Sequence, residues 1–181
     1  AIRVSLVGSE MCIRDRCALL ARDRHGCSRV VVLDLDVHQG DGTATILAGE
    51  EGIVTISVHC AQNFPFRKMV SDHDIAIESG AGDDEYLSVV DDAMALVEQY
   101  EPELLLFQAG VDGLAQDALG RLELSREGMR YRNKRVFDYV LDNEVPCVVF
   151  MGGGYSKPIY YTVDSLFDLF RGAANANSLL P

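Results

Sequence analysis

The sequence lacks a C-x-x-C pair, and its apolar runs are too short to cross a bilayer. Its five cysteines are odd in number, which argues against both a disulfide framework and a cysteine zinc site. The first sixteen residues show neither a sustained apolar core nor a small-residue cleavage pattern, so no signal peptide is predicted. These absences favour a cytoplasmic protein with reduced thiols and no membrane partner.

Positive charge is also scarce, because 16 lysines and arginines stand against 28 aspartates and glutamates, giving a net charge of −12. This balance disfavours direct binding of a phosphate backbone, so no nucleic-acid partner is expected. An acidic surface would suit a cationic substrate such as a lysine-rich tail or a polyamine, although it also serves simply to keep a protein in solution. The 181 residues suffice for one domain with a real core.

Four short apolar runs predict the buried strands of a parallel sheet. They are residues 29–33, 53–58, 104–108 and 146–151. Helical patterns cover residues 84–100 and 125–143, and residues 165–170 begin a closing helix. Because strands alternate with helices, the sequence predicts an α/β fold, with a parallel sheet flanked by helices on both faces.

Residues that can carry chemistry follow each predicted strand. They stand in the segments Asp34–His38, Ser57–His59, Ala109–Asp112 and Gly152–Tyr155. In open α/β sheets, ligands bind beyond the carboxyl ends of the strands. We therefore expect all four segments to meet at one edge of the sheet.

The first of these segments has a pattern typical of metal ligands. Asp34, Asp36 and His38 alternate with apolar residues, so their side chains face one way in an extended chain. Carboxylates crowded together are costly unless a cation or a proton compensates them. Asp36 and His38, joined by Asp112, would leave an open position, as in catalytic zinc sites. A metal held there would polarise a carbonyl and lower the pKa of bound water.

Other interpretations of this D-x-D pattern remain open at this point. An EF-hand loop follows a helix and needs a late Glu, whereas here a strand precedes the motif and Thr45 stands twelfth. A phosphotransferase of the haloacid dehalogenase type would use Asp34 as its nucleophile, but such enzymes resemble D-x-D-G-T and Val37-His38 follow here. Aspartates that merely cap a strand–helix turn are the third interpretation.

Several longer motifs together resemble the histone deacetylase family, in the family's order. They are DLDVHQGDGT (34–43), QAGVD (108–112), DALGRLELS (117–125) and MGGGY (151–155). NFPFRK (63–68) and GDDEYL (82–87) are similar to its small bacterial and class IV members. The resemblance implies the arginase/deacetylase fold and a zinc-dependent hydrolase that removes acetyl or other acyl groups from acetyl-lysine-type amides. Its substrates would be acetylated lysine in proteins, acetylated polyamines or other small amides.

The resemblance also implies roles for individual residues. Asp36, His38 and Asp112 would be the zinc ligands. The Tyr155 phenol would hydrogen-bond the substrate carbonyl and then the oxyanion. Phe64 matches an aromatic wall of the acyl-lysine tunnel, and a buried core phenylalanine is the alternative at this position.

Further matched positions concern substrate, potassium and orientation. Gly153 and Gly154 belong to the turn that shapes the substrate site and projects the next side chain into it. Asp34 and Ser57 match positions that hold a potassium ion close to the zinc. Asp34 and Asp41 also match the aspartates that orient the family's paired histidines, and so they complete the predicted catalytic residues.

The sequence departs from the family because it contains no adjacent histidines, whereas the family places such a pair upstream as general base and electrostatic partner. We therefore expect an N-terminally truncated chain. Residues 1–16 are interpreted as a non-native or disordered segment, 17–173 as the C-terminal part of a deacetylase catalytic domain, and 174–181 as a tail. One flank should then expose apolar surface and an unpaired strand edge.

The truncation also bears on activity, since the expected general base is missing. His25 and His73 are predicted in surface loops, and His59 is the one remaining candidate for a replacement base. We expect that this chain alone does not turn over substrate. A catalytically dead fragment that still binds metal or acyl-lysine is therefore the second alternative to an active deacetylase.

Overall fold

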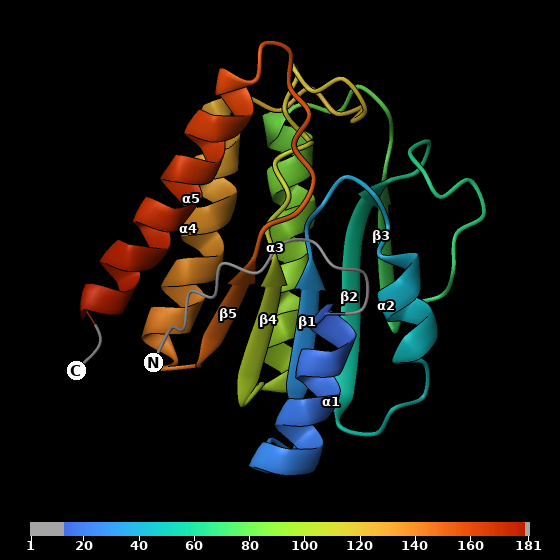
Figure 1. Cartoon of the computed structure of the whole chain (residues 1–181), viewed down its shortest axis with the longest axis vertical. Coiled ribbons are helices and arrows are strands. Elements are labelled where there is room, and N and C mark those ends of the chain that lie inside the picture. The colour runs from blue at the N-terminus through green and yellow to red at the C-terminus, as the bar shows by residue number, and fades with distance from the viewer. Residues whose placement is uncertain (1–12, 180–181) are drawn as a thin grey trace.

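The computed structural model describes residues 13–179, in which five parallel strands form one sheet with helices on both faces (Figure 1). The strands are β1 (Val30–Asp34), β2 (Ile53–Cys60), β3 (His73–Ile77), β4 (Leu104–Gln108) and β5 (Cys147–Phe150). The helices are α1 (Ile13–His25), α2 (Asp41–Ile46), α3 (Asp83–Tyr100), α4 (Arg126–Asp142) and α5 (Tyr160–Leu179). The strand order is β3-β2-β1-β4-β5, so β1 lies at the centre.

Alternating residues of β1 serve two apolar cores, one on each face of the sheet. Val31 and Leu33 pack with residues of α3, α4 and α5. Val30 and Val32 pack on the opposite face with residues of α1 and with Leu47, which follows α2. All five residues of β1 are buried, as a strand must be when helices cover both faces of its sheet. This explains why the strand is an unbroken apolar run in the sequence.

The predicted parallel α/β fold is confirmed, with one strand missing from the prediction. β4 has the predicted bounds, and the three other predicted strands differ from theirs by one or two residues. The missed strand, β3, lies at the edge of the sheet, and only Ile77 among its residues is buried. Such a strand gives no continuous apolar run. His73 therefore lies in a strand and not in a loop, with its Nε2 2.8 Å from the Tyr100 hydroxyl.

Two helical predictions are confirmed. α3 begins one residue before its predicted start, and Ser125 caps α4 by accepting a hydrogen bond from the Gly128 amide (3.0 Å). His25 was expected in a loop, but it is the last residue of α1, where it is exposed.

The two chain ends were predicted less well. The closing helix begins at Tyr160 and continues to Leu179, so most of the predicted 174–181 tail is helical. Ala173 and Ala176 are buried against the main core, and tertiary packing of this kind stabilises a helix end that composition alone does not reveal. Ile13–Arg16, part of the segment interpreted as non-native or disordered, belong to α1. Residues 1–12 and 180–181 lie outside the described residues.

Helices α4 and α5 are joined by a buried carboxylate. Asp168 of α5 accepts hydrogen bonds from Arg126 (2.6 Å) and Arg130 (2.8 Å) of α4, and from Arg171 of its own helix (2.9 Å). The Asp168 side chain is nearly inaccessible to solvent. Three guanidinium groups therefore compensate one buried charge, as burial of a carboxylate requires.

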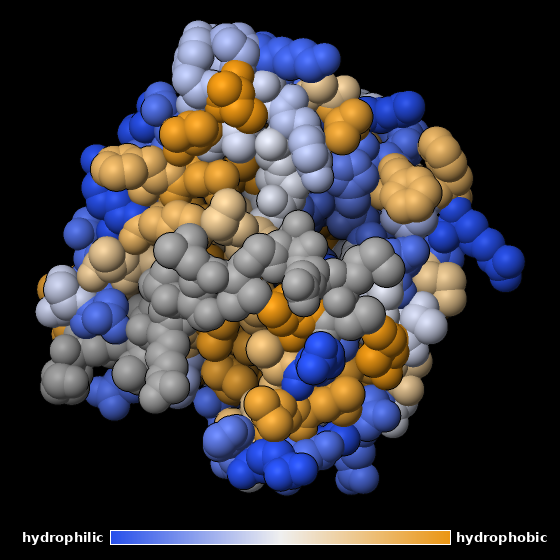
Figure 2. Space-filling model, in the orientation of Figure 1, coloured by the Kyte–Doolittle hydropathy of each residue, from blue (hydrophilic) through white to orange (hydrophobic). Residues whose placement is uncertain are grey.

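The flank beside α5 has the features expected for an incompletely covered sheet. Among the described residues, β5 pairs only with β4. Val163 and Phe167 are large apolar side chains exposed on α5, and Figure 2 shows apolar residues on the surface over α1 and α5. No helix within residues 13–179 is long and apolar enough to span a membrane.

Candidate metal centre and adjoining cavities

The strand register brings the predicted segments to one edge of the sheet. Asp34, the last residue of β1, is paired with Ser57 of β2 on one side and with Gln108 of β4 on the other. The Leu35 amide continues this alignment by donating to the Gln108 carbonyl (3.1 Å). The segments that follow β1 and β4 therefore leave the sheet side by side.

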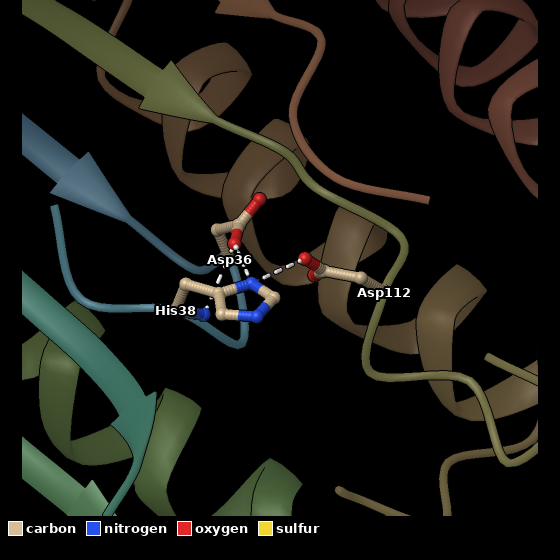
Figure 3. Close-up of side chains that lie close together, drawn as sticks. All are labelled: Asp36, His38 and Asp112. Carbon is tan, nitrogen blue, oxygen red and sulfur yellow. Dashed lines mark hydrogen bonds and ion pairs between the residues drawn. The ribbon is translucent and has the colours of Figure 1, made fainter. Parts of the chain in front are cut away.

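Three side chains from these segments converge, as Figure 3 shows. Asp36, His38 and Asp112 each offer one ligand atom, and these atoms all lie within 4.8 Å of one another. His38 Nδ1 lies 2.9 Å from Asp112 Oδ2 and 3.3 Å from Asp36 Oδ1. Two ligand atoms that are each about 2.0 Å from a tetrahedral zinc would be about 3.3 Å apart. The donor set therefore fits a zinc ion in both chemistry and spacing.

Backbone amides orient the two carboxylates. Asp36 Oδ2 accepts a hydrogen bond from the Gly153 amide (2.7 Å), and its Oδ1 accepts one from the His38 amide (3.0 Å). Asp112 Oδ1 accepts one from the Val37 amide (3.0 Å). Both aspartates are buried. Their free oxygen lone pairs are thus preorganised toward the imidazole of His38.

The cluster is short of positive charge. Burial, followed by the charge of Asp36, raises the pKa of Asp112 to about 7. Hydrogen bonds to Asp112 and Asp36 raise the pKa of His38 to about 10. Burial alone would raise the pKa of Asp36, but hydrogen bonding, chiefly from His38, lowers it to about 2. The two carboxylates therefore stabilise a proton on the imidazole, and a metal ion would displace this proton on binding.

The glycines after β5 are required by close packing and not by unusual backbone angles. A Cβ on Gly153 would overlap the Asp112 carboxylate, and a Cβ on Gly154 would lie 2.7 Å from methyl groups of Val111 and Thr162. The segment can therefore approach the cluster only without side chains. Tyr155 follows directly, with its amide donating to Asp117 Oδ2 (2.6 Å) and its ring half exposed.

A cavity of about 370 Å³, called the metal cavity below, contains the cluster. Of the predicted site residues it is lined by Asp34, Asp36, His38, Asp41, Phe64, Asp112, Gly153 and Tyr155. Gly154 and Ser57 do not line it. Phe64 is 61% exposed, so the alternative of a buried core phenylalanine is wrong.

Asp34 and its neighbours have their own partners. The Asp34 carboxylate accepts hydrogen bonds from Arg14 (2.7 Å) and from the Asp36 amide (3.1 Å), and burial raises its pKa to about 6 despite the arginine. Ser57 Oγ lies 3.0 Å from His59 Nδ1. His59 is buried within β2, and it lines neither the metal cavity nor the second cavity that adjoins the metal cavity. Asp41 is exposed at the start of α2, where its carboxylate accepts from the Gly42 amide (3.0 Å).

Two residues that support the site were not predicted. Arg132 of α4 is fully buried and donates to the Gly110 carbonyl (2.6 Å), beneath the segment that carries Asp112. Its signal was present, since it is a charged residue within the apolar face of a helix that includes Met129 and Val136. Asn63 lies 3.3 Å from His38 Nε2 through its amide nitrogen. No spacing in the sequence indicated that contact.

Comparisons with known proteins agree with this geometry. The model of the histone deacetylase domain matches residues 12–166. An uncharacterized protein of Picosynechococcus is 38% identical over 157 residues, covering 84% of the chain and 52% of the relative. Histone deacetylase 2 of Arabidopsis thaliana is 33% identical over 150 residues, covering 80% and 38%. The chain thus spans about half, or less, of the length of these relatives.

Solved structures show the same fold at low sequence identity. The acetylpolyamine aminohydrolase from Burkholderia pseudomallei matches 92% of the chain and 49% of its own, with a TM-score of 0.71 at 20% identity. The HDA15 HD domain matches 90% of the chain and 49% of its own, with a TM-score of 0.75 at 19% identity. The arginase/deacetylase type of fold expected from the sequence is therefore confirmed.

Proposed function

Because the chain belongs to the histone deacetylase family, we propose that the whole protein hydrolyses acetyl-lysine-type amides and releases acetate and a free amine. One observation carries this proposal: Asp36, His38 and Asp112 form a metal-type cluster in a cavity that Tyr155 also lines. The match to the histone deacetylase domain and the similarity to a histone deacetylase-like amidohydrolase support this proposal. The zinc dependence and the residue roles are our proposals.

Asp36, His38 and Asp112 would hold the zinc ion. When bound, zinc polarises a carbonyl and lowers the pKa of a coordinated water. Tyr155 supplies the hydroxyl that donates to the acyl oxygen, since its side chain lines the same cavity. One preorganised donor to a developing oxyanion contributes roughly 2.7–4 kcal/mol. Gly153 holds Asp36 through its amide, and Phe64 packs against the acyl-bearing chain.

The general base is proposed to come from the part of the protein that the chain does not span. Among the described histidines, only His38 lines the metal cavity. His59 lies 4.0 Å from Asp74 within the sheet, and His73 contacts Tyr100. We therefore propose that the 181-residue chain binds metal but does not turn over substrate alone, since a positioned base contributes roughly 10²–10⁴-fold.

The remaining roles follow the same resemblance. Asp34 and Asp41 would orient base residues supplied from outside the chain, since both line the metal cavity. A potassium ion near Asp34 and Ser57 would have to rely largely on backbone oxygens, because their side chains are bonded to Arg14 and His59. Proposed substrates are acetylated lysine in proteins and acetylated polyamines, in the cytoplasm, with no nucleic-acid partner.

The phosphotransferase alternative is disfavoured by this environment. A nucleophilic Asp34 would need an accessible, ionised carboxylate. The Asp34 carboxylate is instead buried against Arg14, and burial raises its pKa. An acid-labile phosphate on Asp34 after incubation with a phosphate donor and magnesium would overturn the deacetylase assignment.

Metal binding is the first experiment. Asp112→Ala should abolish stoichiometric zinc binding by the chain, because it removes a ligand that is buried and fixed by the Val37 amide. Asp92→Ala is the matched control, since Asp92 is exposed on α3, and it should bind zinc as the parent does. Zinc content is measured after dialysis by atomic spectroscopy. Retention of stoichiometric zinc by the Asp112 variant would contradict the ligand set.

Turnover is the second experiment. The 181-residue chain and a version extended upstream to the length of its relatives are loaded with zinc, and acetate release from an acetyl-lysine peptide is measured. We expect release by the extended version only, and a chelator should stop it. Comparable turnover by the two proteins would show that the base is misplaced, and His59 would then be the first residue to mutate.

A further inference from the structure

A second cavity adjoins the metal cavity and is called the outer cavity here. Its volume is about 420 Å³. It is lined by His38, Gln62, Asn63, Phe64, Phe66, Leu119, Arg121 and Tyr155. Three of these residues, His38, Phe64 and Tyr155, also line the metal cavity. The two cavities therefore meet at these residues, and the outer one offers space for the part of a substrate that lies beyond its acyl group.

The wall of the outer cavity is apolar and exposed. Phe64 and Phe66 are 61% and 85% exposed, and their rings meet edge to face with centroids 6.2 Å apart. Lys68 closes their loop by donating to the carbonyls of Asn63 (2.6 Å) and Pro65 (2.7 Å). Exposed aromatic side chains held in one place are typical of a surface that covers a ligand's hydrocarbon part.

The amide side chains of the outer cavity are already used within the protein. Gln62 accepts from the Ser79 amide (2.9 Å) and donates to Glu78. Asn63 donates to the Leu119 carbonyl (2.8 Å) and accepts from the Arg121 amide (3.0 Å). Neither amide is free to recognise a ligand without breaking these bonds.

Arg121 differs from Gln62 and Asn63 because its side chain is not used in this way within the part of the chain that the structure describes. Its backbone is fixed, because its amide donates to Asn63 and its carbonyl accepts from the Gly80 amide (2.7 Å). Its guanidinium makes no hydrogen bond or ion pair with any residue in the range 13–179, whereas Arg126 and Arg130 both bind Asp168. In a chain with a net charge of −12, this arginine stands at the cavity without a partner among the described residues. Its planar donors match a carboxylate.

We propose that Arg121, with Phe64 and Phe66, forms a recognition subsite for N-acylated amines that bear a carboxylate on the side remote from the acyl group. The phenylalanines cover the hydrocarbon between the amide and the carboxylate, and the Arg121 guanidinium binds the carboxylate. The inference rests on the proposed function, because that function places the acyl group at the cluster. It narrows the substrate class to amides with an anionic end.

Two matched compounds test the subsite: Nα,Nε-diacetyl-lysine with a free carboxylate, and its carboxamide. Their dissociation constants are measured by calorimetry on the zinc-loaded chain. The parent should prefer the carboxylate. Arg121→Gln should weaken carboxylate binding roughly three- to tenfold while leaving the carboxamide unchanged, the range for a partly exposed charge-assisted pair. Arg121→Lys should keep part of the preference, since it retains the charge.

Arg67→Gln is the control, because Arg67 is exposed on the loop that carries Phe64 and Phe66 but lines neither cavity. It should keep the preference intact. A preference that persists in Arg121→Gln, that Arg67→Gln removes equally, or that the parent lacks would overturn the subsite. The proposed function fails separately, when the extended zinc enzyme hydrolyses neither compound, and the binding comparison still reports on Arg121 in that case.

Discussion

The floor and the rim of the site are built in different ways. The floor consists of Asp36, Asp112 and the glycines beside them, and its carboxylates are buried and held by backbone amides. The rim consists of Phe64, Phe66, Leu119, Arg121 and Tyr155, all exposed and carried by loops. Strand ends fix the floor, whereas contacts between loops fix the rim. The fold thus preserves the cluster while the loops set what reaches it.

Adding a single methyl group should be enough to disrupt the floor. Gly153→Ala places a Cβ against the Asp112 carboxylate and moves the amide that holds Asp36. We expect a loss of about 1–3 kcal/mol in unfolding free energy from overpacking, and zinc affinity lower by about 10–100-fold.

Gly42→Ala is the control for that change, because nothing lies within 4 Å of a Cβ at Gly42 within α2. It should raise stability by about 0.5 kcal/mol. Urea unfolding and competition with a chromophoric chelator measure the two quantities. Unchanged zinc affinity in Gly153→Ala would show that the floor accommodates the added Cβ without moving the zinc ligands.

Support from beneath the floor should matter nearly as much. Arg132→Met fills a similar volume but leaves the buried Gly110 carbonyl without its donor. The unfolding free energy should fall by roughly 1.5–3 kcal/mol, the range for hydrogen bonds from charged groups. Arg135→Met, an exposed position on the same helix, should change it by about 0–1 kcal/mol. If Arg132→Met and Arg135→Met lowered the unfolding free energy equally in urea, Arg132 would not support the floor.

Asp168 is a buried carboxylate outside the site, and its contribution to stability should depend on pH. Burial opposes ionisation of Asp168, but hydrogen bonds from Arg126 and Arg130 outweigh it and lower its pKa to about 2. A group whose pKa falls on folding stabilises the folded protein at any pH above the pKa that the group has in the unfolded chain, which is about 3.9 for an aspartate. This stabilisation is lost as the pH falls from about 4 to about 2. Asp168→Asn should flatten thermal stability across that window, and an unchanged slope would contradict the arrangement.

The rim should show the smallest effect on folding. Phe66→Ala removes a ring that is 85% exposed, so the unfolding free energy should change by less than about 0.5 kcal/mol. Turnover of the extended enzyme should show a higher KM at nearly constant kcat, because the ring contributes binding and no chemistry. A fall in kcat alone would move Phe66 from the rim to the catalytic machinery.

Sequence reasoning found the floor because strand ends of a parallel sheet meet at one edge. Asp36, His38 and Asp112 can be grouped on that rule from the sequence alone. The rim was less accessible, since Asn63 contacts Leu119 and Arg121 across more than fifty residues and no local pattern encodes such a bond. β3 was missed because an edge strand with one buried residue has no apolar run. Arg132 was visible in principle, as a charge on an apolar helix face.

The Asn63 side chain has a consequence for how this site can diversify. It bonds both the Leu119 carbonyl and the Arg121 amide, and so it joins two loops into a single structural unit. A graft of residues 63–68 from a relative, without residues 117–121, would replace the side chain that bonds the second loop while leaving that loop unchanged. Exchange of both loops together should therefore alter the rim with less damage than exchange of either loop alone, and it leaves the metal cluster unaltered.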